Sequence, residues 1–128
     1  MKFEDIYKDD IFANEMGITL SELNDQHAVM TLSVEPRHLN GGHVAHGGAI
    51  FTLADISMAA VANYNQPISV SIQSDMRFLA AAKLGDTLIA EAVGVFGRKS
   101  MYNCRTTITN QNGEMIAIAE GMFHTKRV

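Results

Sequence analysis

The residues best suited to chemistry lie close together in the first half of the chain. In order they are Asn40, then His46, Gly47 and Gly48, and then Asp55. Two glycines at the start of a helix leave its first backbone N–H groups open to an external atom, and these groups have no partner inside the helix. The helix dipole adds to their attraction for negative charge. Gly47 is therefore a candidate donor to a carbonyl oxygen that becomes anionic, an effect of about 3–4 kcal/mol per donor.

Asp55 lies within the apolar run of residues 49–62. A carboxylate among apolar side chains is costly unless it is hydrogen-bonded or has a chemical task. It is either an acid satisfied by a neighbouring hydroxyl or the acid–base group of a reaction, just as Gly47 and Gly48 could merely relieve crowding where the helix begins. Burial would raise the pKa of Asp55, whereas a donor such as Ser71 would lower it, so the sequence leaves its ionisation open.

The spacing of Gly47 and Asp55 carries a further prediction. They are eight residues apart in the sequence, which corresponds to about 12 Å along a helix. The two groups cannot act on one carbonyl from the same helix, because a reacting carbon must lie within about 3 Å of each. If they cooperate, they come from different subunits, and the sequence predicts an active site shared between chains.

The composition indicates the kind of molecule that must position these residues. With 128 residues, of which 47% are hydrophobic and 19% charged, the chain is expected to form one domain over residues 1–128. Its net charge of −4 argues against nucleic acid as a partner. The run 49–62 is too short to span a membrane. A single cysteine, Cys104, and the absence of a signal-like start predict a cytoplasmic protein.

The apolar pattern changes from a helical to an alternating period along the chain. Residues 47–63 are apolar on nearly every side and predict a central helix wrapped by other elements. Alternation then predicts four strands, and turn signals at Phe96–Ser100 and Asn112-Gly113 make sequential antiparallel pairing the simplest topology. The expected elements are a short helix at 9–15, strands at 18–23 and 28–34, the helix at 47–63, and strands at 70–79, 86–96, 101–109 and 115–125. This is an α+β layout with a curved sheet.

The segment of residues 38–55, HLNGGHVAHGGAIFTLAD, resembles the signature of hotdog-fold acyl-CoA thioesterases of the PaaI (phenylacetate-pathway) family, and Leu84–Leu88 continues the likeness. The resemblance covers nearly the whole chain. It implies a curved antiparallel sheet of five to six strands around one long helix, and a homodimer joined edge to edge that assembles to a homotetramer. It also implies hydrolysis of a coenzyme A thioester with an aryl or a short or medium acyl group.

The same resemblance assigns roles to individual residues. Gly47 would polarise the thioester carbonyl, and Asp55 of the opposite subunit would act as general base or as a nucleophile that forms a mixed anhydride. Asn40 would position the attacking water or the carboxylate, and His46 would organise the loop. The substrate-binding residues expected beside them are Gly48, one of Ser71, Gln73 and Ser74 on the strand after the helix, and Arg98 and Lys99.

The proposed substrate determines which basic residues and which cofactors the protein would need. Coenzyme A carries phosphates, for which Arg98 and Lys99 are the best candidates, although a solvated turn explains them equally well. No metal or redox cofactor is needed, because a thiolate is already a competent leaving group. His38, His43 and His46 have no carboxylate or cysteine among them, so we expect no metal site.

Two other functions remain compatible with the same fold. One is a non-catalytic module that binds acyl-CoA or lipid, which would need an apolar pocket but not Asp55. The other is a hydratase or dehydratase, which usually pairs a carboxylate with a histidine, whereas His46 precedes Asp55 by nine residues. Release of free thiol from acyl-CoA favours the thioesterase over both.

Overall fold

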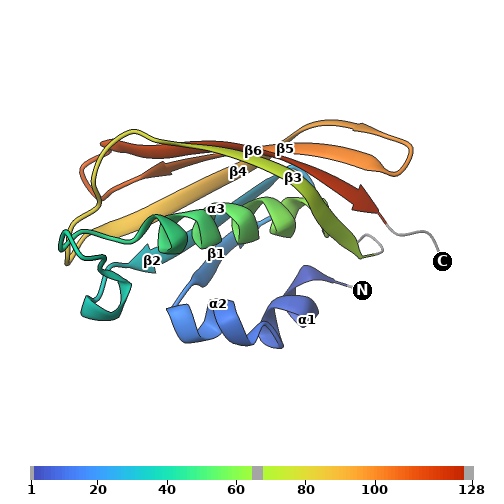
Figure 1. Ribbon diagram of the computed structural model, residues 1–128. Helices are drawn as coiled ribbons and strands as arrows, with labels where there is room; N and C mark the ends of the chain where they lie inside the picture. The colour runs from blue at the N-terminus through green and yellow to red at the C-terminus, as the bar shows by residue number, and fades with distance from the viewer. Residues whose placement is uncertain (1, 65–67, 126–128) are drawn as a thin grey trace.

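The computed structural model describes residues 2–64 and 68–125 of the chain. A curved antiparallel sheet of six strands arches over one long helix, as the α+β prediction requires (Figure 1). The elements are α1 (Phe3–Lys8), α2 (Ile11–Met16), β1 (Thr19–Leu23), β2 (His27–Ser33), the 3₁₀ turn η1 (Pro36–His38), α3 (Gly47–Ala62), β3 (Ser69–Phe78), β4 (Thr87–Arg98), β5 (Met101–Thr109) and β6 (Met115–Thr125).

The strand order is β1-β2-β4-β5-β6-β3, and this corrects one prediction. Strands β4, β5 and β6 form the expected meander, but β3 pairs with β6 and not with β4. The connection of residues 79–86 carries the chain past the positions of β6 and β5 to a place beside β2. Sequential pairing failed for β3 because alternation reports which face of a strand is buried and says nothing about its neighbours.

The concave face of the sheet forms the core with α3. Along β4 the inward side chains of Leu88, Ala90 and Ala92 are fully buried, and Leu53 and Met58 of α3 pack against this face. Short alanine side chains on the sheet let the helix approach closely. The sheet therefore holds α3 along its length. This contact determines which side chains of α3 face the sheet and which face away from it.

The other side of α3 is not fully covered, contrary to the prediction of a helix wrapped all round. Gly48, Phe51, Thr52, Asp55 and Ala59 are exposed or half-buried, and Phe51 is 40% exposed. These residues recur every three or four positions and so form one stripe, which we call the open stripe of α3. Helix α2 lies on the side of α3 away from the sheet (Figure 1), and the residues of this stripe keep part of their surface exposed.

Several element boundaries differ from the prediction for local reasons. The structure has two short helices where the sequence predicted one, because Asp10 caps the start of a separate helix α2. Gly17 then ends α2 in a left-handed conformation with φ of 81°. Strand β4 continues to Arg98, so only Lys99 and Ser100 form the turn to β5. Within the part of the chain that the structure describes, no helix has the length and apolar character needed to cross a membrane.

Candidate active site

The loop before α3 is closed by the side chain of Asn40. Its Oδ1 accepts hydrogen bonds from the backbone N–H groups of Gly42 (2.9 Å) and Val44 (3.2 Å), and its own N–H donates to the Val44 carbonyl at 2.8 Å. An asparagine that binds backbone groups two and four residues ahead sets the shape of a tight turn. The Nδ2 group of Asn40 has no acceptor among the described residues, so this half of the amide is available to an external atom.

His46 connects that loop to the helix. Its N–H donates to the His38 carbonyl at 2.7 Å, and its Nδ1 accepts the N–H of Gly48 at 2.9 Å as the N-cap of α3. One of the unpaired N–H groups at the start of the helix is thereby satisfied. Because the His46 ring binds the N–H of Gly48, that amide is not available to an external atom.

The free amide is that of Gly47, the first residue of α3. No acceptor for its N–H lies among the described residues. Gly47 also lines an open apolar cavity of about 350 Å³ together with Ile50, Phe78 and Leu79. A Cβ at Gly47 would lie 3.5 Å from the Phe78 ring, so the backbone sits directly against this wall. The structure therefore places a lone N–H donor, at the positive end of a helix, beside a pocket for an apolar group.

Asp55 lies two turns further along α3, on the open stripe. It is half-buried, and its carboxylate has no hydrogen-bond partner among the residues that the structure describes. Burial raises the pKa of Asp55 above its usual value, and the negative charge of Asp10 raises it further. A carboxyl group with a raised pKa and no partner is a candidate for proton transfer or nucleophilic attack.

The predicted hydroxyl and amide partners on β3 do not reach Asp55 within one chain. Ser71 and Gln73 are exposed and flank an irregularity in the pairing of β3 with β6. The hydroxyls of Ser71 and Ser74 lie 3.2 Å from each other. Of the two opposing influences on the pKa of Asp55 that the sequence left open, burial acts within the single chain, and the charge of Asp10 adds to it.

A second cavity, of about 440 Å³, lies at the opposite end of α3. Arg98 and Lys99 line it, together with Tyr64 and Tyr102. Sequence reasoning identified the two cations but missed the tyrosines. Nothing in the sequence pointed to Tyr102. In the structure a Cβ at Gly94 would lie 1.8 Å from the Tyr102 hydroxyl oxygen, so the glycine leaves room for that ring.

Sequence reasoning also missed Asp10. The residue begins α2, where its Oδ1 accepts the N–H of Ala13 at 2.9 Å, and its charge acts on Asp55 and on Tyr7. Its sequence signal, an acid before a short helix, points only to a helix cap. Proximity to Asp55 arises from the packing of α2 on α3.

The three histidines of the loop do not converge. Both ring nitrogens of His38 are engaged in hydrogen bonds, His43 is exposed with φ of 64°, and His46 caps α3. Within residues 2–64 and 68–125, no three His, Cys, Asp or Glu side chains form a group that could hold a metal ion.

Comparison with known proteins shows the family of this chain. The family model described as "Thioesterase superfamily" matches residues 42–117. The acyl-coenzyme A thioesterase PaaI of Escherichia coli is 31% identical over 119 residues, covering 93% of this chain and 85% of that protein. The solved structure of E. coli PaaI has a TM-score of 0.95 at 29% identity and covers 98% of this chain and 91% of that one.

A further solved structure is described as containing coenzyme A. It is a hypothetical thioesterase protein of Streptococcus pneumoniae with coenzyme A, which has a TM-score of 0.83 at 28% identity and covers 97% of this chain and 96% of that one. The sheet wrapped around one helix and the match to the thioesterase superfamily identify a hotdog-fold thioester hydrolase. The chain belongs to the thioesterase superfamily and is a homologue of PaaI, as the resemblance of residues 38–55 predicted.

Proposed function

We propose that this chain hydrolyses acyl-coenzyme A thioesters with an aryl or a short or medium acyl group. The name of E. coli PaaI and the coenzyme A bound to the S. pneumoniae protein support this substrate class. The observation that carries the proposal is the N–H of Gly47, which has no acceptor among the described residues and lies beside an apolar cavity.

In the proposed reaction the thioester oxygen accepts a hydrogen bond from Gly47. This bond strengthens as the carbonyl oxygen becomes anionic, so it stabilises the transition state more than the substrate. The N–H of Gly48 is already held by His46. Gly48 instead contributes by having no side chain over the entrance to the first turn.

The attacking group is Asp55 of the partner subunit or a water molecule that it deprotonates. Asn40 helps to orient that water through its free Nδ2 group. A single turnover in ¹⁸O-labelled water identifies the nucleophilic route if water cleaves the mixed anhydride at the Asp55 carbon, because the label then enters the Asp55 carboxylate. Water that attacks the acyl carbon labels the released acid in either route, so detection of acylated Asp55 by mass spectrometry after rapid quenching is the test that separates them. Either route releases the thiolate of coenzyme A as leaving group and needs no metal or redox cofactor.

The two edges of the sheet support a dimer joined through β3. The β3 edge exposes Val70 and Ile72, at 52% and 54%, whereas the β1 edge exposes Thr19 and Glu22. An exposed apolar edge strand is a template for pairing with another chain. Antiparallel pairing of two β3 strands about a twofold axis would lay the two α3 helices side by side in opposite directions, which brings Gly47 of one chain towards Asp55 of the other. Two such dimers would form the homotetramer.

The cavity at the end of α3 suits the nucleotide of coenzyme A. Arg98 and Lys99 supply positive charge for phosphates, and Tyr64 and Tyr102 supply flat apolar surface for adenine. The subunit that contributes Asp55 would hold the nucleotide at the end of the same helix. Replacing Arg98 and Lys99 by alanine should then raise KM for an acyl-CoA and leave KM unchanged for the matching acyl-pantetheine, which lacks the nucleotide.

The remaining parts of the proposal concern the domain, the location and the partners of the protein. We place the function in one domain over residues 1–128 and in the cytoplasm, where the free and buried Cys104 stays reduced. The substrate is a small molecule, and neither nucleic acid nor a membrane is a partner in this proposal.

Gly47→Pro is the sharpest test, because it removes the N–H and puts the ring Cδ in the place of its hydrogen. Proline is well tolerated at the first position of a helix. His46 already has φ of −62° and ψ of 138°, which is the conformation that a following proline requires. We expect kcat to fall by about 10²–10³, as for other oxyanion donors, with the helix content unchanged by circular dichroism.

Gly47→Ala is the matched control. It keeps the N–H, and its methyl group would meet the Phe78 ring at an ordinary contact distance of 3.5 Å. Equal activity of the proline variant and the alanine variant would exclude this amide as the oxyanion donor. Failure of the wild-type protein to release thiol from any acyl-CoA in a panel would exclude the proposed substrate class.

A further inference from the structure

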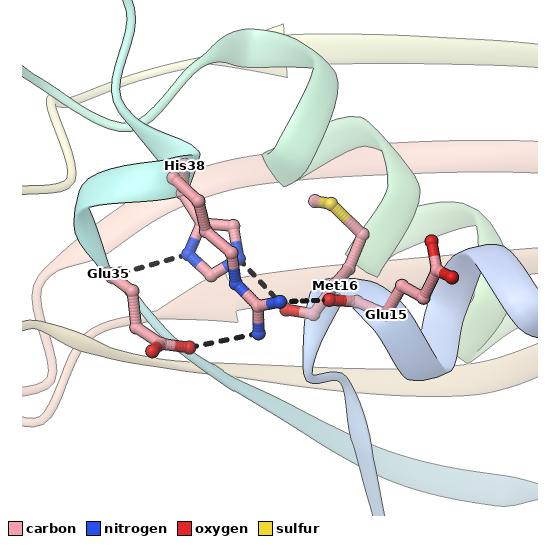
Figure 2. A network of polar contacts seen from close by, with 5 residues as sticks. Glu15, Met16, Glu35 and His38 are labelled. Carbon is pink, nitrogen blue, oxygen red and sulfur yellow. Dashed lines mark hydrogen bonds and ion pairs between the residues drawn. The ribbon is translucent and has the colours of Figure 1, made fainter.

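The last carbonyl groups of α2 are bonded to the turn that precedes the active-site loop. A helix of six residues is too short to be stable alone, so its terminal groups depend on partners elsewhere. The Glu15 carbonyl accepts from the Arg37 guanidinium, which is also 3.0 Å from Glu35. The Met16 carbonyl lies 2.8 Å from Nε2 of His38 (Figure 2).

His38 is only 2% exposed, and each of its polar groups has a partner. Nδ1 accepts the N–H of Glu35 at 2.9 Å, so in the neutral ring Nε2 carries the proton and donates it to Met16. The backbone carbonyl of the same residue accepts the N–H of His46 at 2.7 Å. One buried residue therefore joins three segments: its ring bonds the end of α2 and the residue before η1, and its backbone carbonyl bonds the residue before α3.

We propose that His38 is a positioning residue, which couples the hairpin of α1 and α2 to the loop that carries Asn40, His46 and Gly47. This inference rests on the proposed function, since it assigns His38 a part in that reaction. Asn40 closes the turn within this loop, and the contacts at the two ends of the loop determine where the turn lies on the molecule. The end at His38 is held through Met16, and the same hairpin carries Asp10, whose charge acts on Asp55.

Two substitutions separate the bonds of the ring. In His38→Asn the amide oxygen can replace Nδ1 and keep the bond to Glu35, but the side chain is too short to reach Met16. In His38→Gln the amide nitrogen can replace Nε2 and keep the bond to Met16. We expect His38→Asn to lower kcat by about ten- to a hundredfold with little change in KM, since small misplacements at an active site have effects of this size. His38→Gln should restore most of the loss.

Hydrogen exchange provides a readout independent of activity. His38→Asn should increase amide exchange both in residues 3–16 and in residues 39–48, whereas His38→Gln should leave both segments protected. Thr106→Val is the stability control, because it removes a buried hydroxyl that bonds Ser57 at 2.9 Å, away from this network. It should lower the melting temperature without increasing exchange in either segment.

Some results would overturn the inference. Wild-type kcat in His38→Asn would do so, as would exchange that rises in residues 3–16 alone. Equal losses of kcat in the asparagine, glutamine and Thr106→Val variants would reduce His38 to a residue of general stability. If the wild-type protein hydrolyses no acyl-CoA, the proposed function fails, and the exchange experiment alone then decides the coupling.

Discussion

In the proposed reaction, two regions of this protein contribute to catalysis in different ways. The loop of residues 38–47 is closed within one chain: Asn40 binds the loop backbone, the His38 carbonyl accepts the N–H of His46, and the Gly47 amide and Nδ2 of Asn40 stay available to external atoms. The open stripe of α3 is incomplete. Its Asp55 has no hydrogen-bond partner in the described chain, and Phe51 beside it is 40% exposed.

The difference shows how the site is divided. A densely hydrogen-bonded loop is already organised and can hold an oxyanion donor rigidly before substrate binds. An unpartnered carboxyl group on a partly apolar stripe gains its surroundings only when a second surface covers it. Under the proposed function, the chain therefore contains a finished half-site in the loop and an unfinished one on α3.

The largest effect is expected at Asp55, in the unfinished half. Asp55→Asn should lower kcat by about 10²–10⁴, the usual range for a positioned acid–base group. Because burial and Asp10 raise the pKa of Asp55, its ionised form destabilises the fold above the usual carboxyl pKa. At pH 7 the variant should thus melt at the same temperature as the wild type or higher, by calorimetry. Full activity in a folded variant would remove Asp55 from the mechanism.

Mixing two inactive variants tests whether the two halves come from different chains. A heterodimer of Gly47→Pro and Asp55→Asn chains has one site with both lesions and one site with neither. Random reassembly after mild unfolding should therefore restore about a quarter of wild-type activity. Each variant reassembled alone is the control. No gain on mixing, with heterodimers demonstrated by mass spectrometry, would mean that both groups act within one chain.

A substitution on the β3 edge tests whether a second subunit paired through β3 covers the open stripe of α3. Ile72→Lys puts a charge on the exposed apolar edge, so we expect a weaker dimer and an activity that rises with protein concentration. Thr19→Lys, on the opposite edge of the same sheet, is the matched control and should change neither property. Sedimentation equilibrium beside kinetic assays gives both quantities. An unchanged dimer in Ile72→Lys would place the interface elsewhere.

The smallest expected effect concerns Asp10 and the pH profile. Asp10→Asn keeps a good helix cap but removes the negative charge that raises the pKa of Asp55. The acid limb of kcat/KM, which follows ionisation of Asp55 in the free enzyme, should move to lower pH. Asp9→Asn, an exposed neighbour whose charge does not act on Asp55, is the control. An unmoved limb, or the same shift in both variants, would contradict this role.

Some parts of the fold could be read from local patterns. Strands β5 and β6 begin and end where alternation placed them, and α3 begins at Gly47 as the two glycines indicated. Hydrophobic periodicity reports the local face of an element, and capping residues report its ends, so both are encoded within a few residues. The partner of β3 was not predictable in this way, because pairing depends on a crossover of the chain and not on the strand itself.

The same distinction applies to the active site. The sequence by itself determined which residue types stand at the start and the middle of α3, and helix geometry then required the Gly47 amide and the Asp55 carboxyl to lie too far apart for one carbonyl. Tertiary structure alone decided that His46 occupies the neighbouring amide and that Asp10 acts on Asp55. These contacts join segments that are brought together only by packing, and the energy of packing is a property of the whole fold rather than of any short segment.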